Sequence, residues 1–247
     1  MKRLAPLLAY LPWHARDALG RAAAPLVIAL GIIGIPIYAF IGASAERSIE
    51  DPRSADMALG IYNNGLPLAL TLGAIVLMNQ VIALDREKQH FRFLLAHPVA
   101  AWEYYLQRFI VGLALFAAFA ALIPVVFSAL VVDVSVVGVV RAAALQGLLY
   151  GAIAALCGVL WQKDGLALIV IVIVAQIMQD LKKAEQLVSW LEPVARALPP
   201  VGSISAIRSQ WLVGAAADQS ELLFIIAYGV GTLAVALFLV KRLPLAR

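Results

Sequence analysis

Residues 109–132 read FIVGLALFAAFAALIPVVFSALVV and contain no charged side chain. At 1.5 Å per residue a helix over this range is about 36 Å long, more than the roughly 30 Å of hydrocarbon in a bilayer. Because backbone polar groups in lipid must be satisfied within their own segment, we expect a bundle of membrane-spanning helices. Other long stretches without charge lie at 22–45, 57–84, 142–162, 165–179 and 222–240.

The composition agrees with a membrane location. Hydrophobic residues make up 63% of the 247 residues, and charged residues only 14%. A soluble domain is closer to half apolar and a quarter charged. The net charge of +4 is better explained by basic residues held on the cytoplasmic side of a bilayer than by a nucleic-acid partner. The single cysteine, Cys157, lies within an apolar run, where we expect a small buried filler.

The sequence predicts one all-α polytopic domain over 1–247. The fifth stretch, GLALIVIVIVAQIMQ, reaches only about 22 Å as a helix, so it must borrow flanking residues, thin the bilayer or fold back. We expect residues 1–24 to form an amphipathic N-terminal segment rather than a cleaved signal, with an apolar face made of Leu4, Leu7, Leu8 and Leu11. We place the six spans at about 25–43, 65–84, 106–132, 139–161, 165–180 and 222–240.

The basic residues predict the orientation. With both termini cytoplasmic, twelve of the nineteen lysines and arginines fall inside. This excess agrees with the positive-inside rule, although the long segment after the fifth span obeys that rule weakly. The residues left outside are Arg47, Arg53, Arg141, Lys182, Lys183, Arg196 and Arg208.

Residues 85–98, DREKQHFRFLLAHP, separate the second and third spans. Asp85 suits a helix N-cap, and Glu87 suits the first turn, where a negative charge meets the positive end of the helix dipole. Phe91, Leu94 and Leu95 recur on one helical face, and Pro98 ends the helix. This pattern predicts a short amphipathic helix along the cytoplasmic surface. From the residues alone it could float at the interface or dock a partner.

Residues 180–221 follow the fifth span and are amphipathic rather than plainly soluble. Leu187, Trp190, Leu191 and Val194 recur at helical spacing, and Ile204, Ile207 and Trp211 do so after the break at Pro199-Pro200. We expect two short helices before span six. Whether they lie on the outer surface or re-enter the membrane stays open.

Uncharged polar residues within or next to the spans can either link helices by hydrogen bonds or line a substrate path. We expect no buried acidic residue in the spans of the kind that proton-coupled carriers use. Gly147 and Gly151 form a G-x-x-x-G that permits close helix contact, and Gly229 and Gly231 loosen the sixth span. The polar candidates for a path are Asn79, Gln80, Gln146, Gln176 and Gln179.

No enzyme motif is found. The chain has no G-x-x-x-x-G-K-[ST], G-x-S-x-G or H-E-x-x-H. His14, His90 and His97 fall in cytoplasmic segments without the spacing of a metal site, so we expect surface or interface positions for them. The sequence therefore predicts no catalytic and no metal-ligating residue in this chain.

The run of Glu87, Leu94-Leu95 and Pro98-Val99 before an aromatic-flanked third span resembles the cytoplasmic coupling helix of type-2 ABC exporter permeases. The six-span layout, the amphipathic N-terminal helix and the long segment before span six resemble that family over the whole chain. Gln89-His90 and Ala100-Ala101 depart from it, since the family usually has Gly-Thr and a Ser-Arg type of pair there.

The resemblance implies a permease subunit of an ATP-driven exporter in a bacterial or archaeal cytoplasmic membrane. Two copies of a separate ATPase would bind ATP and Mg, and a second permease copy or a paralogue would complete the transporter. The alternatives are a non-transporting membrane scaffold that recruits an ATPase, and a membrane-embedded enzyme. The ATPase contact implied by the resemblance comprises Asp85, Arg86, Glu87, Lys88, His90, Phe91, Arg92, Leu94 and Leu95.

Overall fold

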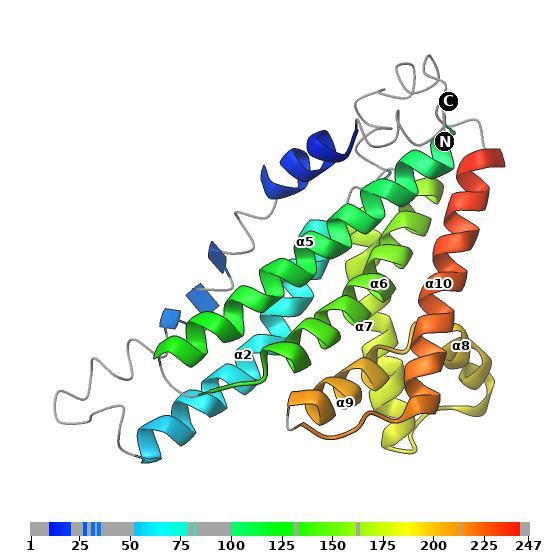
Figure 1. Cartoon of the computed structure of the whole chain (residues 1–247). Coiled ribbons are helices and arrows are strands. Elements are labelled where there is room, and N and C mark those ends of the chain that lie inside the picture. Colours follow the sequence, from blue (N-terminus) through cyan, green and yellow to red (C-terminus); the bar gives the residue numbers. More distant parts are fainter. Residues whose placement is uncertain are drawn as a thin grey trace.

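The computed structural model is a bundle of long helices (Figure 1). It describes residues 10–20, 27–28, 31–32, 34–35, 52–78, 82, 100–130, 133–161, 164–212 and 214–242. All regular structure in these ranges is helical, which confirms the predicted all-α class. Besides the helical segment 10–20, the helices are α2 (Pro52–Met78), α5 (Ala101–Leu130), α6 (Val136–Leu160), α7 (Asp164–Lys183), η1 (Ser189–Leu191), α8 (Glu192–Ala197), α9 (Val201–Leu212) and α10 (Gln219–Arg242).

Five helices are long and apolar enough to span a membrane, which indicates a multi-pass membrane protein. The first predicted span, 25–43, falls largely outside the described residues, although 27–28, 31–32 and 34–35 are helical. The five candidate spans are Leu59–Met78, Ala101–Ala129, Val136–Leu160, Gly165–Lys183 and Gln219–Arg242.

The bundle has two distinct ends. At the Arg242 end, α2 and α10 end and α5 begins, and the helical segment 10–20 packs close by (Figure 1). At the α9 end, α8 and α9 lie beside the starts of α6 and α10. Tyr228 of α10 donates a hydrogen bond from its hydroxyl to the Ala197 carbonyl, 3.0 Å away, and so ties α10 to the end of α8.

Helix α6 is the centre of the bundle, because it contacts α2, α5, α7, α9 and α10. Its sequence is apolar all round and rich in alanine and glycine, as a helix buried on every side requires. A Cβ added to Gly147 would lie 2.7 Å from Leu113 Cδ1 of α5, and one added to Gly151 would lie 2.8 Å from Phe109 Cε2. Both glycines therefore allow the close packing of α5 against α6 that the G-x-x-x-G predicts.

The two glycines of α10 lie in different surroundings. A Cβ on Gly229 would lie 3.0 Å from Leu148 Cγ of α6, whereas one on Gly231 would meet nothing within 4 Å. Gly229 is thus a packing position against the central helix. That these glycines loosen the sixth span stays a prediction.

The fifth span is longer than its uncharged stretch. Helix α7 has 20 residues, which gives about 30 Å of helix. It gains this length at its C-terminal end by including Asp180, Lys182 and Lys183. Lysines at a span end can extend their ammonium groups toward the headgroups, so the charges do not shorten the helix. Helix α2 likewise begins at Pro52, well before the predicted span at 65–84.

Side-chain caps fix the connections. Gly138 N donates to Ser135 Oγ at 3.1 Å and starts α6. Ser220 N and Oγ donate to Asp218 Oδ1 at 2.8 and 2.7 Å, next to the start of α10. These bonds lower the pKa of the Asp218 carboxyl, because they favour its charged form. Caps of this kind satisfy amides that have no partner within the helix.

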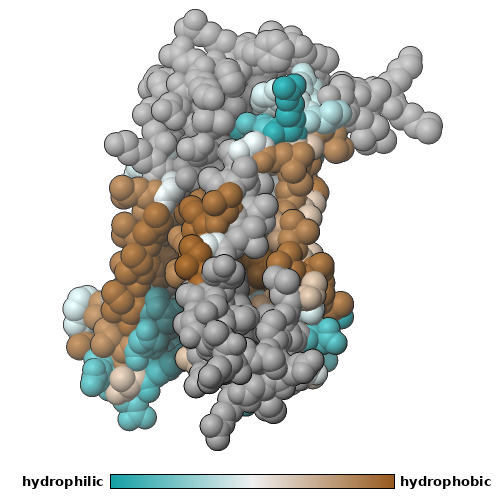
Figure 2. Space-filling view, turned by 90° about the vertical axis from the view of Figure 1, so that its left-hand side faces the viewer, coloured by the Kyte–Doolittle hydropathy of each residue, from teal (hydrophilic) through white to brown (hydrophobic). Residues whose placement is uncertain are grey.

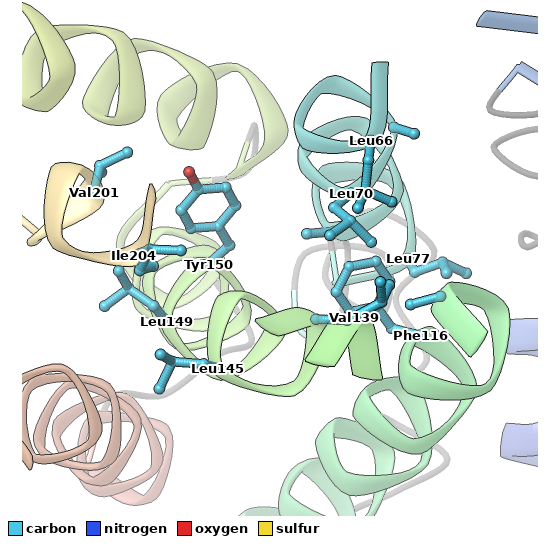
Figure 3. Close-up of a cluster of buried hydrophobic side chains, with 14 of the residues drawn as sticks. Leu66, Leu70, Leu77, Phe116, Val139, Leu145, Leu149, Tyr150, Val201 and Ile204 are labelled. Carbon is cyan, nitrogen blue, oxygen red and sulfur yellow. The ribbon is translucent and has the colours of Figure 1, made fainter. Parts of the chain in front are cut away.

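The buried residues form two clusters. The larger joins α2, α5, α6, α7, α9 and α10. Figure 3 shows Tyr150 of α6 with Val201 and Ile204 of α9 on one side and Leu66 and Leu70 of α2 on the other. The smaller lies at the Arg242 end and joins α2, α5, α6 and α10. Its buried members are Met78, Ile82, Tyr104, Tyr105, Phe109, Ala155, Val159, Ala236 and Val240.

The surface is apolar around the middle of the bundle. On the face shown in Figure 2, hydrophobic residues occupy the middle of the described surface and hydrophilic residues lie toward its ends. Helices α7 and α10 expose long apolar side chains, as segments that face lipid or another membrane helix do. Examples are Leu166, Ile173 and Ile177 of α7 and Leu223, Val230 and Phe238 of α10.

Candidate functional site

The predicted ATPase contact lies outside the described residues. The same holds for Asn79 and Gln80 of the predicted path. The flanking helices are described: α2 ends at Met78 and α5 begins at Ala101, both at the Arg242 end. The residues of the predicted ATPase contact, all outside the described ranges, are Asp85, Arg86, Glu87, Lys88, His90, Phe91, Arg92, Leu94 and Leu95.

The helical segment 10–20 is fixed to the first turns of α5. Asp17 Oδ2 accepts a hydrogen bond from Arg108 Nη2 at 3.1 Å, and the Arg108 side chain is only 2% exposed. Charged hydrogen-bonded pairs in such surroundings are among the stronger polar contacts. Removing either partner would leave a poorly solvated charge. The contact holds the start of α5 in a defined place.

His14 contributes to the same contact. Its ring centroid lies 4.7 Å from that of Tyr104 and 5.4 Å from that of Trp13, and the residue is buried. The prediction of a surface or interface position is therefore wrong for His14, because its ring is buried against α5. One face of the segment points toward α5 and carries Tyr10, His14 and Ala18 at helical spacing. The sequence alone could not identify this face as a packing surface, because it did not show which helix is the partner.

The exposed side of the segment carries large apolar side chains together with Arg16. Leu11, Trp13 and Leu19 all have large exposed fractions. A helix that packs one face on the bundle and exposes an apolar face suits the membrane interface, where hydrocarbon can cover that face. Leu11 thus lies on the apolar face predicted for the N-terminal segment, and that face points away from the protein core.

Gln146 is buried near the middle of α6, and its Nε2 donates to Thr71 Oγ1 of α2 at 2.9 Å. Tyr150 lies one turn further along α6 and interacts electrostatically with Arg208 of α9. Burial lowers the pKa of the Arg208 guanidinium, while Tyr150 acts in the opposite sense. Sequence analysis named Gln146 as a polar candidate but counted Arg208 only among the outer basic residues, because Arg208 lies in the short helices expected outside the spans.

Gln179 connects the end of α7 to the start of α9. Its Oε1 accepts from Gly202 N, and its Nε2 donates to the Pro199 carbonyl at 2.9 Å. Gln176 instead donates to both Asp180 carboxylate oxygens, at 3.0 and 3.1 Å, within α7. All three described path candidates therefore make hydrogen bonds inside the chain, and Gln146 and Gln179 link different helices.

A cavity of about 650 Å³ opens at the α9 end, between α7, α8, α9 and α10. Three of its lining residues are basic and one is acidic. Among the residues that the structure describes, no group of three or more histidine, cysteine or carboxylate side chains could hold a metal ion. The cavity is lined by Gln179, Lys182, Lys183, Ala195, Arg196, Leu198, Pro200, Gly202, Ser203, Ala206, Glu221 and Phe224.

Comparison of the chain with models of known protein families, with curated proteins and with solved structures found no match.

Proposed function

We propose that this chain is the transmembrane permease subunit of an ATP-driven exporter of the type-2 ABC class. One observation carries the proposal: the sequence from Glu87 to Val99, which resembles a coupling helix, connects α2 and α5 at the Arg242 end. The helical segment 10–20 packs on α5 at that same end, in keeping with an amphipathic N-terminal helix at the cytoplasmic face. In this proposal the Arg242 end faces the cytoplasm.

The proposed mechanism starts in the partner subunits, which bind ATP and Mg. Closure of two ATPases moves the segment around Glu87–Leu95, and α5 follows because it begins a few residues later. Helix α5 is suited to transmit that movement, since Arg108 fixes its first turns and Gly147 and Gly151 hold it tightly against α6. The nucleotide drives the cycle only if it binds the two conformations with unequal affinity.

The substrate path in this proposal lies between two permease chains rather than within one. Gln146, Gln176 and Gln179 use their amides inside the chain, and α6 is surrounded by other helices. The exposed apolar faces of α7 and α10 leave area for a second permease copy or a paralogue. The same observation favours the second candidate function, a scaffold that recruits an ATPase and transports nothing.

A charge reversal tests the coupling role. We expect Glu87→Arg to leave the chain in the membrane but to lower ATP-driven transport by about tenfold or more, within the usual range of coupling free energies. The measurement is ATP-driven accumulation of fluorescent lipid and drug probes in inverted vesicles, together with ATP turnover. The control is Asp56→Arg, which reverses an exposed carboxylate on α2 near the α9 end.

The outcomes separate the two functions. Wild-type accumulation in the Glu87→Arg vesicles removes the role given to the segment. An unmutated chain that retains a bound ATPase yet accumulates no probe supports the scaffold.

A further inference from the structure

The cavity at the α9 end gathers three basic side chains from two helices. Lys182 and Lys183 come from the last turn of α7, and Arg196 comes from the last turn of α8. Glu221 of α10 is the one acidic side chain of the lining, so the lining is net positive. Arg196 also pairs with Glu192 at 3.0 Å, but both side chains are well exposed, and such a pair contributes little. Arg196 can therefore exchange this partner for a ligand.

The start of α9 adds to this field. Gly202 lies in its first turn, and no acidic residue is found in that turn. Backbone amides at a helix start carry a partial positive charge that a carboxylate or a phosphate normally offsets. Lys183 Nζ would be 3.7 Å from a Cβ at Gly202, so a full positive charge lies next to the helix start. The Gly202 amide already donates to Gln179 Oε1, so Lys183 is the main attraction for an anion at this point.

The rest of the lining is apolar. Leu198 and Phe224 line the cavity with Ala195 and Ala206, and Phe224 is half exposed. The neighbouring surface of α7 and α10 is also apolar, with Ile177 and Leu223 exposed. Both helices are candidate spans, and the cavity lies at their ends, where phospholipid headgroups meet hydrocarbon. A ligand that fits must combine an anionic group with an apolar chain.

We propose that this cavity binds the phosphate of an anionic phospholipid, with one acyl chain against Leu198 and Phe224. The ammonium groups of Lys182 and Lys183 and the guanidinium of Arg196 contact the phosphate oxygens, as cations in basic pockets between membrane helices do. This site lies at the opposite end of the bundle from the proposed ATPase contact. The inference therefore stands or falls independently of the proposed function.

The test is native mass spectrometry of the full chain in detergent, titrated with phosphatidylglycerol, phosphatidylcholine or inorganic phosphate. We expect phosphatidylglycerol to bind most tightly. The double substitution Lys182→Gln with Lys183→Gln should weaken it about 25-fold, roughly fivefold for each lysine. The matched control is Lys241→Gln with Arg242→Gln, which removes the basic pair in the last turn of α10 at the other end. That variant should bind like the unmutated chain.

A substitution that is expected to tighten binding distinguishes a change in the site from misfolding. Glu221→Gln removes the one carboxylate of the lining, so it should tighten phosphatidylglycerol binding about fivefold. A damaged fold cannot produce tighter binding. Equal losses of phosphatidylglycerol affinity in the lysine variant and in its control would overturn the proposal, because the lysines at the α9 end would then contribute no more than basic residues elsewhere. Lysine-dependent binding of inorganic phosphate as strong as that of phosphatidylglycerol would also overturn it, since the apolar wall would contribute nothing.

Discussion

Gln146 shows what a single polar residue does inside this bundle. It is buried on the central helix, and its amide donates to Thr71 of α2. Without that bond the amide would be an unpaired polar group in hydrocarbon. Measured hydrogen bonds between membrane helices nevertheless contribute little free energy, because polar groups of the unfolded chain also find partners in the membrane. The bond therefore aligns α2 with α6 more than it stabilises the whole fold.

A double-mutant cycle measures this bond. Gln146→Leu and Thr71→Val should each lower the free energy of unfolding in detergent, and their coupling should be about 0.6 kcal/mol, with about 1.7 kcal/mol as the upper end. Titration with a denaturing detergent gives the free energy of unfolding of the unmutated chain, of each single variant and of the double variant. Strictly additive effects would show that the two side chains act independently and that the contact has no energetic role.

The sequence was informative about residue types but not about their partners. It identified Gln146 and Gln179 as polar groups in apolar surroundings, for which hydrogen bonding between helices was one of two readings. It could not pair Gln179 with Gly202, because that contact depends on how α9 folds back against α7. His14 shows the same limit, since its burial depends on Tyr104, a residue far away in the chain.

At the scale of elements, α6 organises the bundle through its small residues. Gly147 and Gly151 let α5 approach so closely that a single added carbon would overlap aromatic side chains. Close approach matters in a membrane, where helices associate through packing rather than through exclusion of water. The orientation of α5 relative to α6 is therefore set by these two positions.

A substitution that adds volume tests this packing. Gly151→Val should lower the free energy of unfolding by about 1–3 kcal/mol, the usual range for forcing extra carbons into a packed core. Gly231→Ala on α10 is the matched control, because a Cβ there meets nothing within 4 Å, and stability should be unchanged or slightly higher. Unfolding midpoints in the same detergent give both values. A neutral Gly151→Val would show that α5 and α6 separate easily.

Helix positions were largely predictable, but helix ends were not. Uninterrupted apolar stretches locate α5, α6 and α10 because hydrocarbon excludes charge. Helix α7 runs past its uncharged stretch to Lys183, since the flexible lysine stems keep the helix apolar while their ammonium groups reach polar surroundings. The Pro199-Pro200 pair correctly marks the break between α8 and α9, because proline provides no amide for a continuing helix.

At the scale of the whole molecule, the two ends of the bundle differ in chemistry. The Arg242 end carries an aromatic and ion-pair contact between residues 10–20 and α5. The α9 end carries two short helices and a basic cavity. Five candidate spans connect the ends, and α6 contacts elements along its whole length. The proposed ATPase contact and the proposed phospholipid site are therefore placed at opposite ends, and each is tested separately.

Site-specific photocrosslinking can show whether residues 85–95 contact an ATPase, as the proposed function requires. A photoreactive phenylalanine analogue in place of Phe91 is activated in native membranes, and the products are identified by peptide mass spectrometry. The control places the analogue at Val230, exposed in the middle of α10, where only lipid or another membrane chain can be reached. We expect a Phe91 crosslink to a protein that carries a P-loop. Crosslinks from Phe91 to phospholipid alone would show that this segment has no ATPase partner.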